Sequence, residues 1–317
     1  MRSATQKREL FHSVLARDGL TVVPGGFSPM DAAMTERAGY EAFFLAGSQA
    51  AAFLYGAPDV GVLGLNDMAG HAGRVAGHTD IPVLVDGDTG YGNAVNVYFA
   101  VQQLVRSGAA AVQIEDQEAP KKSGTDAGRR LVSMDEAVGK YRAAARARDE
   151  LDPLFAICAR CDAIGAEDGG FEEAVRRCVR YVEDGGADFV WLNSLQTPEQ
   201  IAEACERIPA PVMTVWGGEG PGPTLDEYER LGLRIALFPV LASKSGLQAA
   251  WDLLHAFRQQ GTPALDDWAR KAAESPWGAA PLPSLTGTER VRRLEDEFLP
   301  TEFRRDYEST FGHTPST

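Results

Sequence analysis

The sequence predicts an α/β protein in which eight parallel strands, each followed by a helix, close into a (β/α)8 TIM barrel with extra C-terminal helices. Short apolar segments alternate with longer segments of helical periodicity along most of the chain. The apolar segments carry hydrophobic residues at successive positions, which is typical of parallel strands buried on both faces. Several helical segments also end in a glycine just before the next apolar segment, which is a common helix stop.

The predicted strands recur through the first 239 residues of the chain. Helical segments lie between them. Residues 171–182, for example, place apolar side chains at i, i+3, i+4, i+7, i+8 and i+11, which is one face of a helix. Eight such units favour a closed barrel over a doubly wound open sheet. The strands are predicted at residues 21–25, 42–47, 82–88, 110–116, 155–162, 188–194, 211–216 and 234–239.

The C-terminal part of the chain is longer than a barrel requires. A long helical segment at residues 241–259 follows the last strand. We expect one barrel domain over residues 1–317, with a helical extension from about residue 262 to residue 317. Apolar residues in the extension recur at helical spacing, which suits packing against another subunit or against the chain's own barrel. Val291, Leu294 and Phe298 show this spacing.

Charge and composition exclude several classes of function. The chain of 317 residues has a formal net charge of -14, so no surplus of Lys and Arg is available for nucleic acids or anionic membranes. No apolar run is long enough to span a bilayer, and the N-terminus lacks an apolar export signal. The four cysteines do not form a disulfide framework in a chain of this size. We therefore expect a cytoplasmic protein that binds neither nucleic acid nor membrane.

Cys158 and Cys161 form a CxxC pattern inside a predicted strand. Residues three apart on a strand face opposite sides of the sheet, so these two thiols are poorly placed to bind one zinc ion or to form a redox pair. We interpret them as small buried structural residues.

Polar residues gather at the C-terminal ends of the predicted strands, which is where barrel enzymes carry their catalytic groups. Carboxylates from the third and fourth strands would repel one another if they converged without a cation. A hard divalent cation removes this conflict. The strand-end residues are Gly47, Ser48, Gln49, Asp86, Asp88, Glu115, Asp116, Arg160, Asp162, Asn193, Ser194, Thr214 and Trp216.

The candidate metal ligands are Asp86, Asp88 and Glu115. A set of oxygen ligands without histidine or cysteine favours Mg2+, or Mn2+, over zinc. Some of these carboxylates would instead cap the helices that follow them, as Asp often does. We interpret Asp116 and Asp162 as residues that orient their neighbours.

Arg160 is the strand-end arginine, and its guanidinium offers two parallel donors to a carboxylate or a phosphonate. The alternative is a structural ion pair with a barrel carboxylate. Lys121 and Lys122 begin a loop, rich in glycine and cationic residues, that is suited to closing over a ligand. A solvated surface loop would have the same composition.

These residues and the segments "DGDTGYGN" and "IEDQ" resemble the phosphoenolpyruvate mutase/isocitrate lyase superfamily over residues 22–299. The resemblance implies a (β/α)8 barrel whose last helix is often exchanged between the subunits of a dimer or tetramer. It also implies Mg2+ that holds a small anionic 2-oxo or 2-hydroxy acid, and a reaction that passes through the enolate of an oxo acid. We therefore expect a homodimer or homotetramer with exchanged helices.

The resemblance also assigns a role to individual residues of this chain. It implies that Asp86 binds the metal directly, and that Asp88, Glu115 and Asp59 hold metal-bound waters. Asp59 lies in "YGAPDVG" and is not identified by its spacing. Arg160 would bind the substrate, and the loop of Gly47, Ser48 and Gln49 would hold the carboxylate of the oxo acid.

The chain departs from the lyase pattern at the loop of residues 121–125, which reads "KKSGT" where carbon–carbon lyases carry Lys-Arg-Cys-Gly-His. Ser123 replaces the cysteine, and a serine hydroxyl is a poor proton donor and acceptor at neutral pH. Asn193, Thr214 and Trp216 also fall where lyases carry other residues, and Phe27 replaces a tyrosine. Residues 128–144 are lyase-like, whereas Asn193 and Ser194 partly match phosphonomutases.

The sequence thus leads to three functional hypotheses. The first is a Mg2+-dependent lyase that breaks a C–C bond next to an oxo-acid unit, by retro-aldol cleavage or by decarboxylation. Arg160, Ser123 and Lys121 would carry catalysis, and Asn193, Thr214 and Trp216 would line the substrate pocket. The alternative is P–C bond chemistry of the phosphonomutase or phosphonopyruvate hydrolase type. The third hypothesis is a homologue without catalytic activity.

Overall fold

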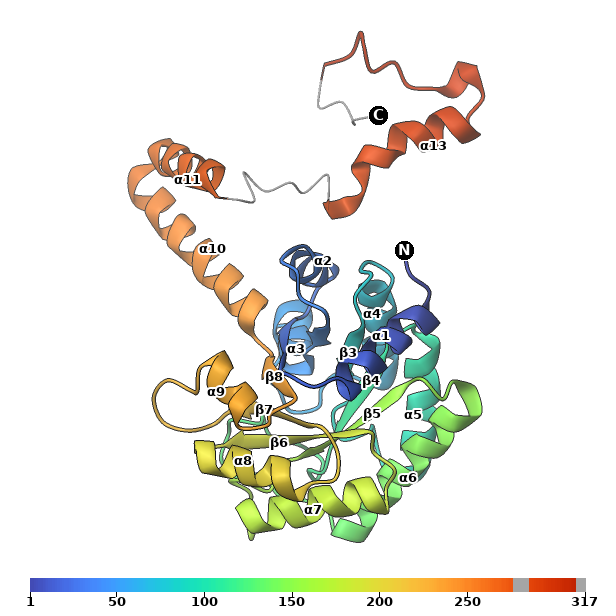
Figure 1. Cartoon of the computed structure of the whole chain (residues 1–317). Helices are drawn as coiled ribbons and strands as arrows, with labels where there is room; N and C mark the ends of the chain where they lie inside the picture. The colour runs from blue at the N-terminus through green and yellow to red at the C-terminus, as the bar shows by residue number, and fades with distance from the viewer. Residues whose placement is uncertain (276–284, 312–317) are drawn as a thin grey trace. The chain divides into compact units, whose positions relative to one another are not determined.

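A computed structural model describes residues 1–275 and 285–311 of the chain. The chain divides into two compact units, residues 1–245 and residues 246–317, and each is described by itself. Within residues 1–245, eight parallel strands form a closed barrel in which every strand pairs with its neighbour in the chain and β8 pairs with β1. Figure 1 shows the strands at the centre of this unit, with helices around them. The structure confirms the predicted (β/α)8 barrel.

Each predicted strand coincides with an observed one. The strands are β1 (Thr21–Gly26), β2 (Phe43–Leu45), β3 (Val83–Asp86), β4 (Ala111–Glu115), β5 (Ala156–Cys161), β6 (Phe189–Leu195), β7 (Val212–Trp216) and β8 (Ile235–Phe238). The helices of the first unit are α1 (Ala4–Ala16), α2 (Pro29–Arg37), α3 (Gly47–Tyr55), α4 (Leu65–Ala76), α5 (Ala94–Arg106), α6 (Met134–Leu151), α7 (Phe171–Glu183), α8 (Pro198–Arg207) and α9 (Leu225–Arg230).

Side chains alternate along the strands between two hydrophobic cores. One core, which includes Leu84, Cys158 and Trp191, fills the interior of the barrel. The other lies between the strands and the helices and includes Cys161. Because successive strand residues point to opposite faces, Cys158 and Cys161 are separated by the sheet, as the sequence predicts.

The same alternation decides which polar residues reach the barrel mouth. Asp86 follows the inward-facing Leu84 by two positions, and Arg160 follows Cys158 in the same way. Glu115 is the register partner of Arg160 across β4 and β5. The strands therefore direct these three charged side chains to the inner face of the barrel, at its C-terminal end.

Helix α7 illustrates how the outer layer forms. Its residues Ala174, Val175, Cys178 and Tyr181 are buried on the face turned to the strands. It begins after Gly170, whose φ of 124° is readily adopted only by glycine. Acidic residues occupy its first turn and Arg180 its last turn, an arrangement that complements the helix dipole. The helix predicted at residues 171–182 is confirmed.

Helix α10 (Leu241–Gln260) extends from the first unit into the second, which also contains α11 (Thr262–Glu274), α13 (Val291–Phe298) and the short 3-10 helices η1 (Thr288–Arg290) and η2 (Thr301–Phe303). The second unit begins at residue 246. The sequence predicts a later start for the helical extension, at about residue 262. Leu247, Trp251 and Leu254 form an apolar stripe on α10 and are exposed within their own unit.

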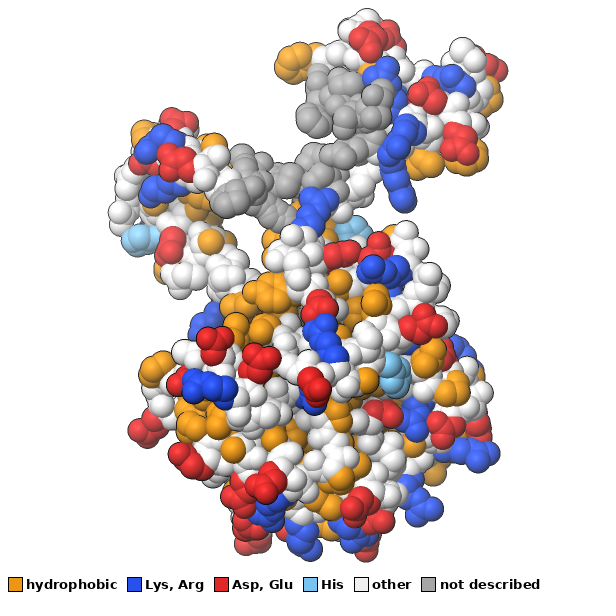
Figure 2. Space-filling model, in the orientation of Figure 1, with side chains coloured by type: hydrophobic (Ala, Val, Ile, Leu, Met, Phe, Trp, Pro, Cys, Tyr) orange, Lys and Arg blue, Asp and Glu red, His pale blue; other side chains and the backbone are white. Residues whose placement is uncertain are grey.

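Charged residues of both signs lie next to one another on the visible face of the barrel (Figure 2). Many are paired, as when Arg207 contacts Glu172 and Glu203. Among the residues that the structure describes, no helix has the length and apolar character needed to cross a membrane.

Candidate active site

A cluster of carboxylates surrounds the ammonium of Lys121 at the mouth of the barrel. Lys121 Nζ lies 2.7 Å from Asp59 Oδ1, 2.6 Å from Asp88 Oδ1 and 3.8 Å from Glu115 Oε1. The backbone N–H of Asp88 donates to Asp86 Oδ1 at 3.0 Å, which joins the fourth carboxylate to the group. We call Asp59, Asp86, Asp88 and Glu115 the acid cluster. The structure brings together the four residues predicted as metal ligands.

The loop after β3 holds its shape through residues in unusual backbone conformations. Asp88 and Tyr91 have φ values of 47° and 61°, in the left-handed region that non-glycine residues rarely adopt. Gly92 has a φ of 144°, and a Cβ there would lie 2.3 Å from the side chain of Asn96. Only glycine fits this position. Strained residues at the mouth of a barrel are typical of a functional site.

Burial dominates the electrostatics of the acid cluster. It raises the pKa of Glu115 to about 8 and the pKa of Asp88 to about 6, because few waters solvate the charged forms. Burial alone would lower the pKa of Lys121, but Glu115, Asp86, Asp88 and Asp59 together raise it. The cluster therefore holds an excess of buried negative charge that Lys121 only partly balances.

Several oxygens of the acid cluster fit a divalent cation. Asp88 Oδ1 and both carboxylate oxygens of Glu115 are buried. Within the described part of the chain their close partners are the cations Lys121 and Arg160, so the site pairs these oxygens with positive charge, which a divalent cation also supplies. Among the described residues, no three acidic, histidine or cysteine side chains converge closely enough to enclose an ion by themselves. This arrangement suits Mg2+, which usually keeps several waters.

In the absence of divalent cations, we expect the stability of the protein to fall as the pH rises from about 5 to about 8. The folded-state pKa of Glu115, about 8, lies above the ordinary value of a glutamate, so folded Glu115 holds a proton that the unfolded chain has already lost. Each increase in pH within this window then favours unfolding. Thermal unfolding in EDTA measures the effect. Glu115→Gln should flatten the slope, and a melting temperature that rises with pH would contradict the expectation.

Arg160 lies next to the acid cluster and is almost fully buried. Its Nη1 is 3.0 Å from Glu115 Oε2, its Nε is 3.0 Å from Asp162 Oδ2, and its guanidinium lies over the Trp191 ring at 4.3 Å. Arg160 therefore forms the structural ion pair with barrel carboxylates that was the alternative to a role in substrate binding. Nη2 also donates to Asp162 Oδ1 at 3.1 Å. A guanidinium has five N–H groups, so Nη1 and Nη2 each keep one N–H that these contacts do not use and that can serve an anionic ligand.

Asp162 connects Arg160 to the loop after β4. Its carboxylate accepts hydrogen bonds from Gln117 Nε2 at 3.1 Å, Arg129 Nη1 at 3.3 Å and Asn193 Nδ2 at 2.6 Å. Burial raises the pKa of Asp162, but the ion pairs with Arg160 and Arg129 outweigh burial and hold this pKa below its ordinary value. The orienting role predicted for this residue matches these contacts.

The loop of residues 121–129 is anchored over the site at two further points. Lys122 N donates to Gln117 Oε1 at 2.9 Å, and Gly124 O accepts from Arg129 Nη1 at 2.8 Å and Asn193 Nδ2 at 2.9 Å. The sequence prediction did not include Gln117 or Arg129 in the site. Gln117 belongs to the "IEDQ" segment, and its place in this segment is the signal that could have identified it as a site residue.

Ser123 lies in this loop between the anchored residues Lys122 and Gly124. Its carbonyl accepts a hydrogen bond from Asp126 N at 2.9 Å, which closes a turn. Its side chain is partly exposed, and its hydroxyl makes no hydrogen bond to the described residues. The loop therefore brings Ser123 to the site with its hydroxyl unpaired.

The start of α3 borders the acid cluster. Gly47 N donates to Asp86 Oδ2 at 3.0 Å, and a Cβ on Gly47 would lie 2.9 Å from the same oxygen. No side chain caps this helix, so the N–H groups of Ser48 and Gln49 stay available to an anion. Gln49 Oε1 accepts a hydrogen bond from Ser243 Oγ at 2.8 Å.

The structure does not bring Thr214 and Trp216 to the acid cluster. On β7 the inward-facing residues are Met213 and Val215, so Thr214 and Trp216 face the helices. Thr214 Oγ1 donates to Leu192 O at 2.7 Å. A place at the end of a strand is therefore not enough to put these two side chains in the site, because alternate residues of β7 face the helices.

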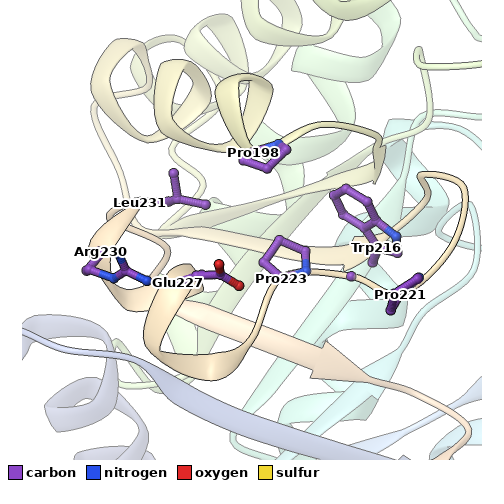
Figure 3. A pocket seen from close by; sticks show the side chains of 8 residues that line it. Pro198, Trp216, Pro221, Pro223, Glu227, Arg230 and Leu231 are labelled. Atoms are coloured by element: carbon purple, nitrogen blue, oxygen red, sulfur yellow. The ribbon is translucent and has the colours of Figure 1, made fainter.

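Trp216 lines a cavity of about 460 Å³ on the outer side of the barrel. Figure 3 shows its ring beside Pro198, Pro221 and Pro223, with Glu227 and Arg230 farther along the same cavity. The end of β7, the segment after it and α9 thus build a separate hollow that shares no lining residue with the acid cluster.

The fold and the site define a (β/α)8-barrel enzyme with a carboxylate cluster suited to a divalent cation. Residues 11–256 match the model of the phosphoenolpyruvate phosphomutase family. The chain belongs to this family, within the phosphoenolpyruvate mutase/isocitrate lyase superfamily. The resemblance found in the sequence is confirmed.

Two curated relatives of the chain are carbon–carbon lyases. It is 38% identical to a 2-methylisocitrate lyase of Aeropyrum pernix over 256 residues, which cover 80% of each chain. It is 33% identical to a 2,3-dimethylmalate lyase of Eubacterium barkeri over 300 residues, which cover 94% of this chain and 99% of the relative.

Solved structures include both kinds of chemistry considered from the sequence. Oxaloacetate acetylhydrolase, in complex with 3,3-difluorooxalacetate, is 28% identical, with a TM-score of 0.82 over 93% of this chain and 98% of that chain. Phosphonopyruvate hydrolase, in complex with oxalate and Mg2+, is 28% identical, with a TM-score of 0.80 over 93% of this chain and 100% of that chain.

Proposed function

We propose that the protein is a Mg2+-dependent lyase that breaks a C–C bond in a small 2-oxo or 2-hydroxy carboxylic acid. The observation that carries this proposal is the buried acid cluster beside Arg160 at the mouth of the barrel. The cluster supplies ligands for a cation, and Arg160 supplies a counter-charge for a carboxylate. The lyase activity of the relatives supports the same conclusion.

Asp86, Asp88, Glu115 and Asp59 would hold the cation, which we propose to be Mg2+, with Mn2+ as a substitute. Bound there, the cation supplies Lewis-acid stabilisation of the negative charge that develops on the oxygen of an oxo acid. The protein contributes a site from which water is largely excluded, because Glu115 is fully buried and Asp86 nearly so.

The substrate's carboxylate is proposed to bind between Arg160 and the start of α3. Arg160 offers N–H donors that are not used by Asp162, and Ser48 and Gln49 offer backbone N–H groups at a helix N-terminus. Asn193 holds the loop over this region through Gly124. These groups orient the acid so that the bond to be broken faces Ser123 and Lys121.

The residue at position 123 bears on which bond breaks. Retro-aldol cleavage leaves a carbon acid that must take up a proton, and the Ser123 hydroxyl is a weaker proton donor than the cysteine of the related lyases. In decarboxylation the departing carbon dioxide needs no proton, and the enolate of the oxo acid that remains can take its proton from water. The serine therefore favours decarboxylation, while the lyase relatives favour retro-aldol cleavage.

Product analysis with a panel of acids tests the proposal. 2-Methylisocitrate, 2,3-dimethylmalate, oxaloacetate and phosphonopyruvate are incubated with the protein in Mg2+ and in EDTA. We expect an oxo acid or carbon dioxide to be released in Mg2+ only, because the buried acid cluster needs its cation. The products together identify the bond: an oxo acid without carbon dioxide or phosphate indicates retro-aldol cleavage, and carbon dioxide indicates decarboxylation.

P–C bond chemistry is the second candidate function, supported by the matching family model and by the resemblance to phosphonopyruvate hydrolase. Release of inorganic phosphate from phosphonopyruvate, or its conversion to phosphoenolpyruvate, with no C–C cleavage of the other acids, would establish this function and contradict the first. A protein that binds Mn2+ but turns over none of the four acids would support the third hypothesis, a homologue without activity.

We also propose that the protein is a cytoplasmic homodimer or homotetramer with exchanged C-terminal helices. The exposed stripe of Leu247, Trp251 and Leu254 has the i, i+4, i+7 spacing of a helix face that packs on a partner. All four cysteines lie in the described chain and are unpaired, which suits a reducing compartment. Light scattering should give a dimer or tetramer mass, and Trp251→Glu should shift it toward the monomer. A monomeric wild-type protein would contradict the proposal.

A further inference from the structure

Lys121 occupies the centre of the site in which the proposed cation would bind. Its side chain is 3% exposed, and Nζ contacts Asp59 Oδ1 at 2.7 Å and Asp88 Oδ1 at 2.6 Å. Both contacts are as short as charge-assisted hydrogen bonds. Asp88 and Asp59 are also two of the proposed cation-binding residues. The ammonium thus already uses oxygens that a divalent cation or its waters would need.

A divalent cation and the Lys121 ammonium would repel each other strongly in this position. Two like charges a few ångströms apart in a water-poor site repel each other far more strongly than they would in bulk water. Placing one of these two cations at the centre of the acid cluster costs far less free energy than placing both there. One cation must therefore give way when the other binds.

The structure provides a place into which Lys121 can move. A cavity of about 500 Å³ adjoins the acid cluster and is lined by Lys121 itself together with Asp88, Tyr91 and Pro120. The Tyr91 hydroxyl is buried, and it has no hydrogen-bond partner among the described residues. Such an unpaired buried oxygen is an acceptor for a displaced ammonium.

We propose that Lys121 is the resident counter-cation of the acid cluster, and that binding of the divalent cation displaces its ammonium into this cavity toward the Tyr91 hydroxyl. The inference rests on the cation site of the proposed function. It adds that the metal-free protein keeps the cluster intact by an internal cation, and that metal binding exchanges this cation for the metal.

Amine acylation read by mass spectrometry tests the displacement directly in the wild-type full chain. The protein is labelled in EDTA and in saturating Mn2+, with saturation established independently from the electron paramagnetic resonance signal of free Mn2+. We expect the acylation rate of Lys121 to rise by about tenfold or more in Mn2+, because a paired, buried ammonium reacts slowly. Lys122 is exposed on the same loop and should react equally in both conditions, so it is the internal control.

The two proposals fail in different ways in this experiment. If the wild-type protein binds no Mn2+, the proposed cation site is overturned and the displacement falls with it. If Mn2+ binds and Lys121 stays as protected as in EDTA, the displacement alone is overturned.

Metal affinities of matched variants give a second measurement that does not depend on turnover. Lys121→Met should bind Mn2+ about tenfold more tightly than wild type, because it removes a competitor for the cluster, and Lys122→Met should stay within about twofold. Tyr91→Phe should bind Mn2+ more weakly, since the displaced ammonium loses its acceptor. Melting temperatures with and without Mn2+ establish that each variant folds. Weaker Mn2+ binding by Lys121→Met would show that Lys121 assists the metal and would overturn the proposal.

Discussion

Replacement of Asp86 by asparagine or alanine is expected to lower turnover by about a thousandfold or more and to abolish measurable Mn2+ binding. Asp86 is the carboxylate assigned as the direct ligand, and its two oxygens also accept from Gly47 N and Asp88 N, each at 3.0 Å. Its removal takes away a ligand and frees the two segments that it positions. Steady-state kinetics with the best acid of the panel and Mn2+ titration measure the two effects.

Two comparisons separate the loss of the ligand from a general effect of charge or folding. Asp86→Asn preserves the volume of the side chain and should be as inactive as Asp86→Ala, because a neutral amide is a poor ligand for Mg2+. Glu118→Gln removes one negative charge from an exposed position only three residues after Glu115 and should keep full activity. Wild-type turnover and Mn2+ affinity in Asp86→Ala would contradict a metal-centred mechanism.

Arg160→Lys is expected to lower kcat/KM by about 100-fold to 1,000-fold even though the charge is kept. Lysine cannot pair with Asp162 through two nitrogen atoms as Arg160 Nε and Nη2 do, and it loses the planar contact with the Trp191 ring. It also lacks the further planar N–H donors that we assign to the substrate's carboxylate. Kinetics over a range of acid concentrations measure the change.

Arg130→Lys is the matched control for this substitution. Arg130 lies in the same part of the chain and forms an exposed ion pair with Glu167, with Nε and Oε2 3.0 Å apart. Exposed pairs contribute little, so this variant should behave like wild type. If Arg160→Lys kept the wild-type kcat/KM, Arg160 would be only a structural partner of Asp162 and Glu115.

The barrel could be predicted from the sequence because local patterns determine it. A strand buried on both faces appears in the sequence as a continuous apolar run, and a helix that covers it appears as apolar residues at helical spacing. Both patterns lie within short windows of the chain. The eight strands were located in this way. The inner positions of Asp86, Glu115 and Arg160 follow from the same period of two along each strand.

Thr214 and Trp216 show that a position at the end of a strand has to be considered together with the face of the sheet to which the side chain points. Both lie at the end of β7, yet the side chain that points into the barrel is Val215. Counting back along the strand to Met213, an apolar residue of the inner core, would have indicated their direction. The position of a residue at a strand end was therefore insufficient to place it in the site.

The loop residues were less predictable for a different reason. Gln117 and Arg129 reach the site because the chain between them folds back over Asp162, and no local periodicity encodes that contact. Asp59 likewise comes from a loop after α3 and was identified through the family resemblance alone. The place of Lys121 at the centre of the acid cluster depends on four segments that meet only in the folded chain.

The close packing of Gly124 sets a boundary for anyone who wishes to redesign this protein for another acid. A methyl group on Gly124 would lie 2.3 Å from Arg160 Nη2 and 2.9 Å from Asn193 Nδ2, so even alanine would push the loop off the arginine. Its neighbours Ser123 and Thr125 are at least partly exposed, so other side chains have room at these positions. A mutant library for new specificity should diversify these two neighbours and leave the glycine between them unchanged.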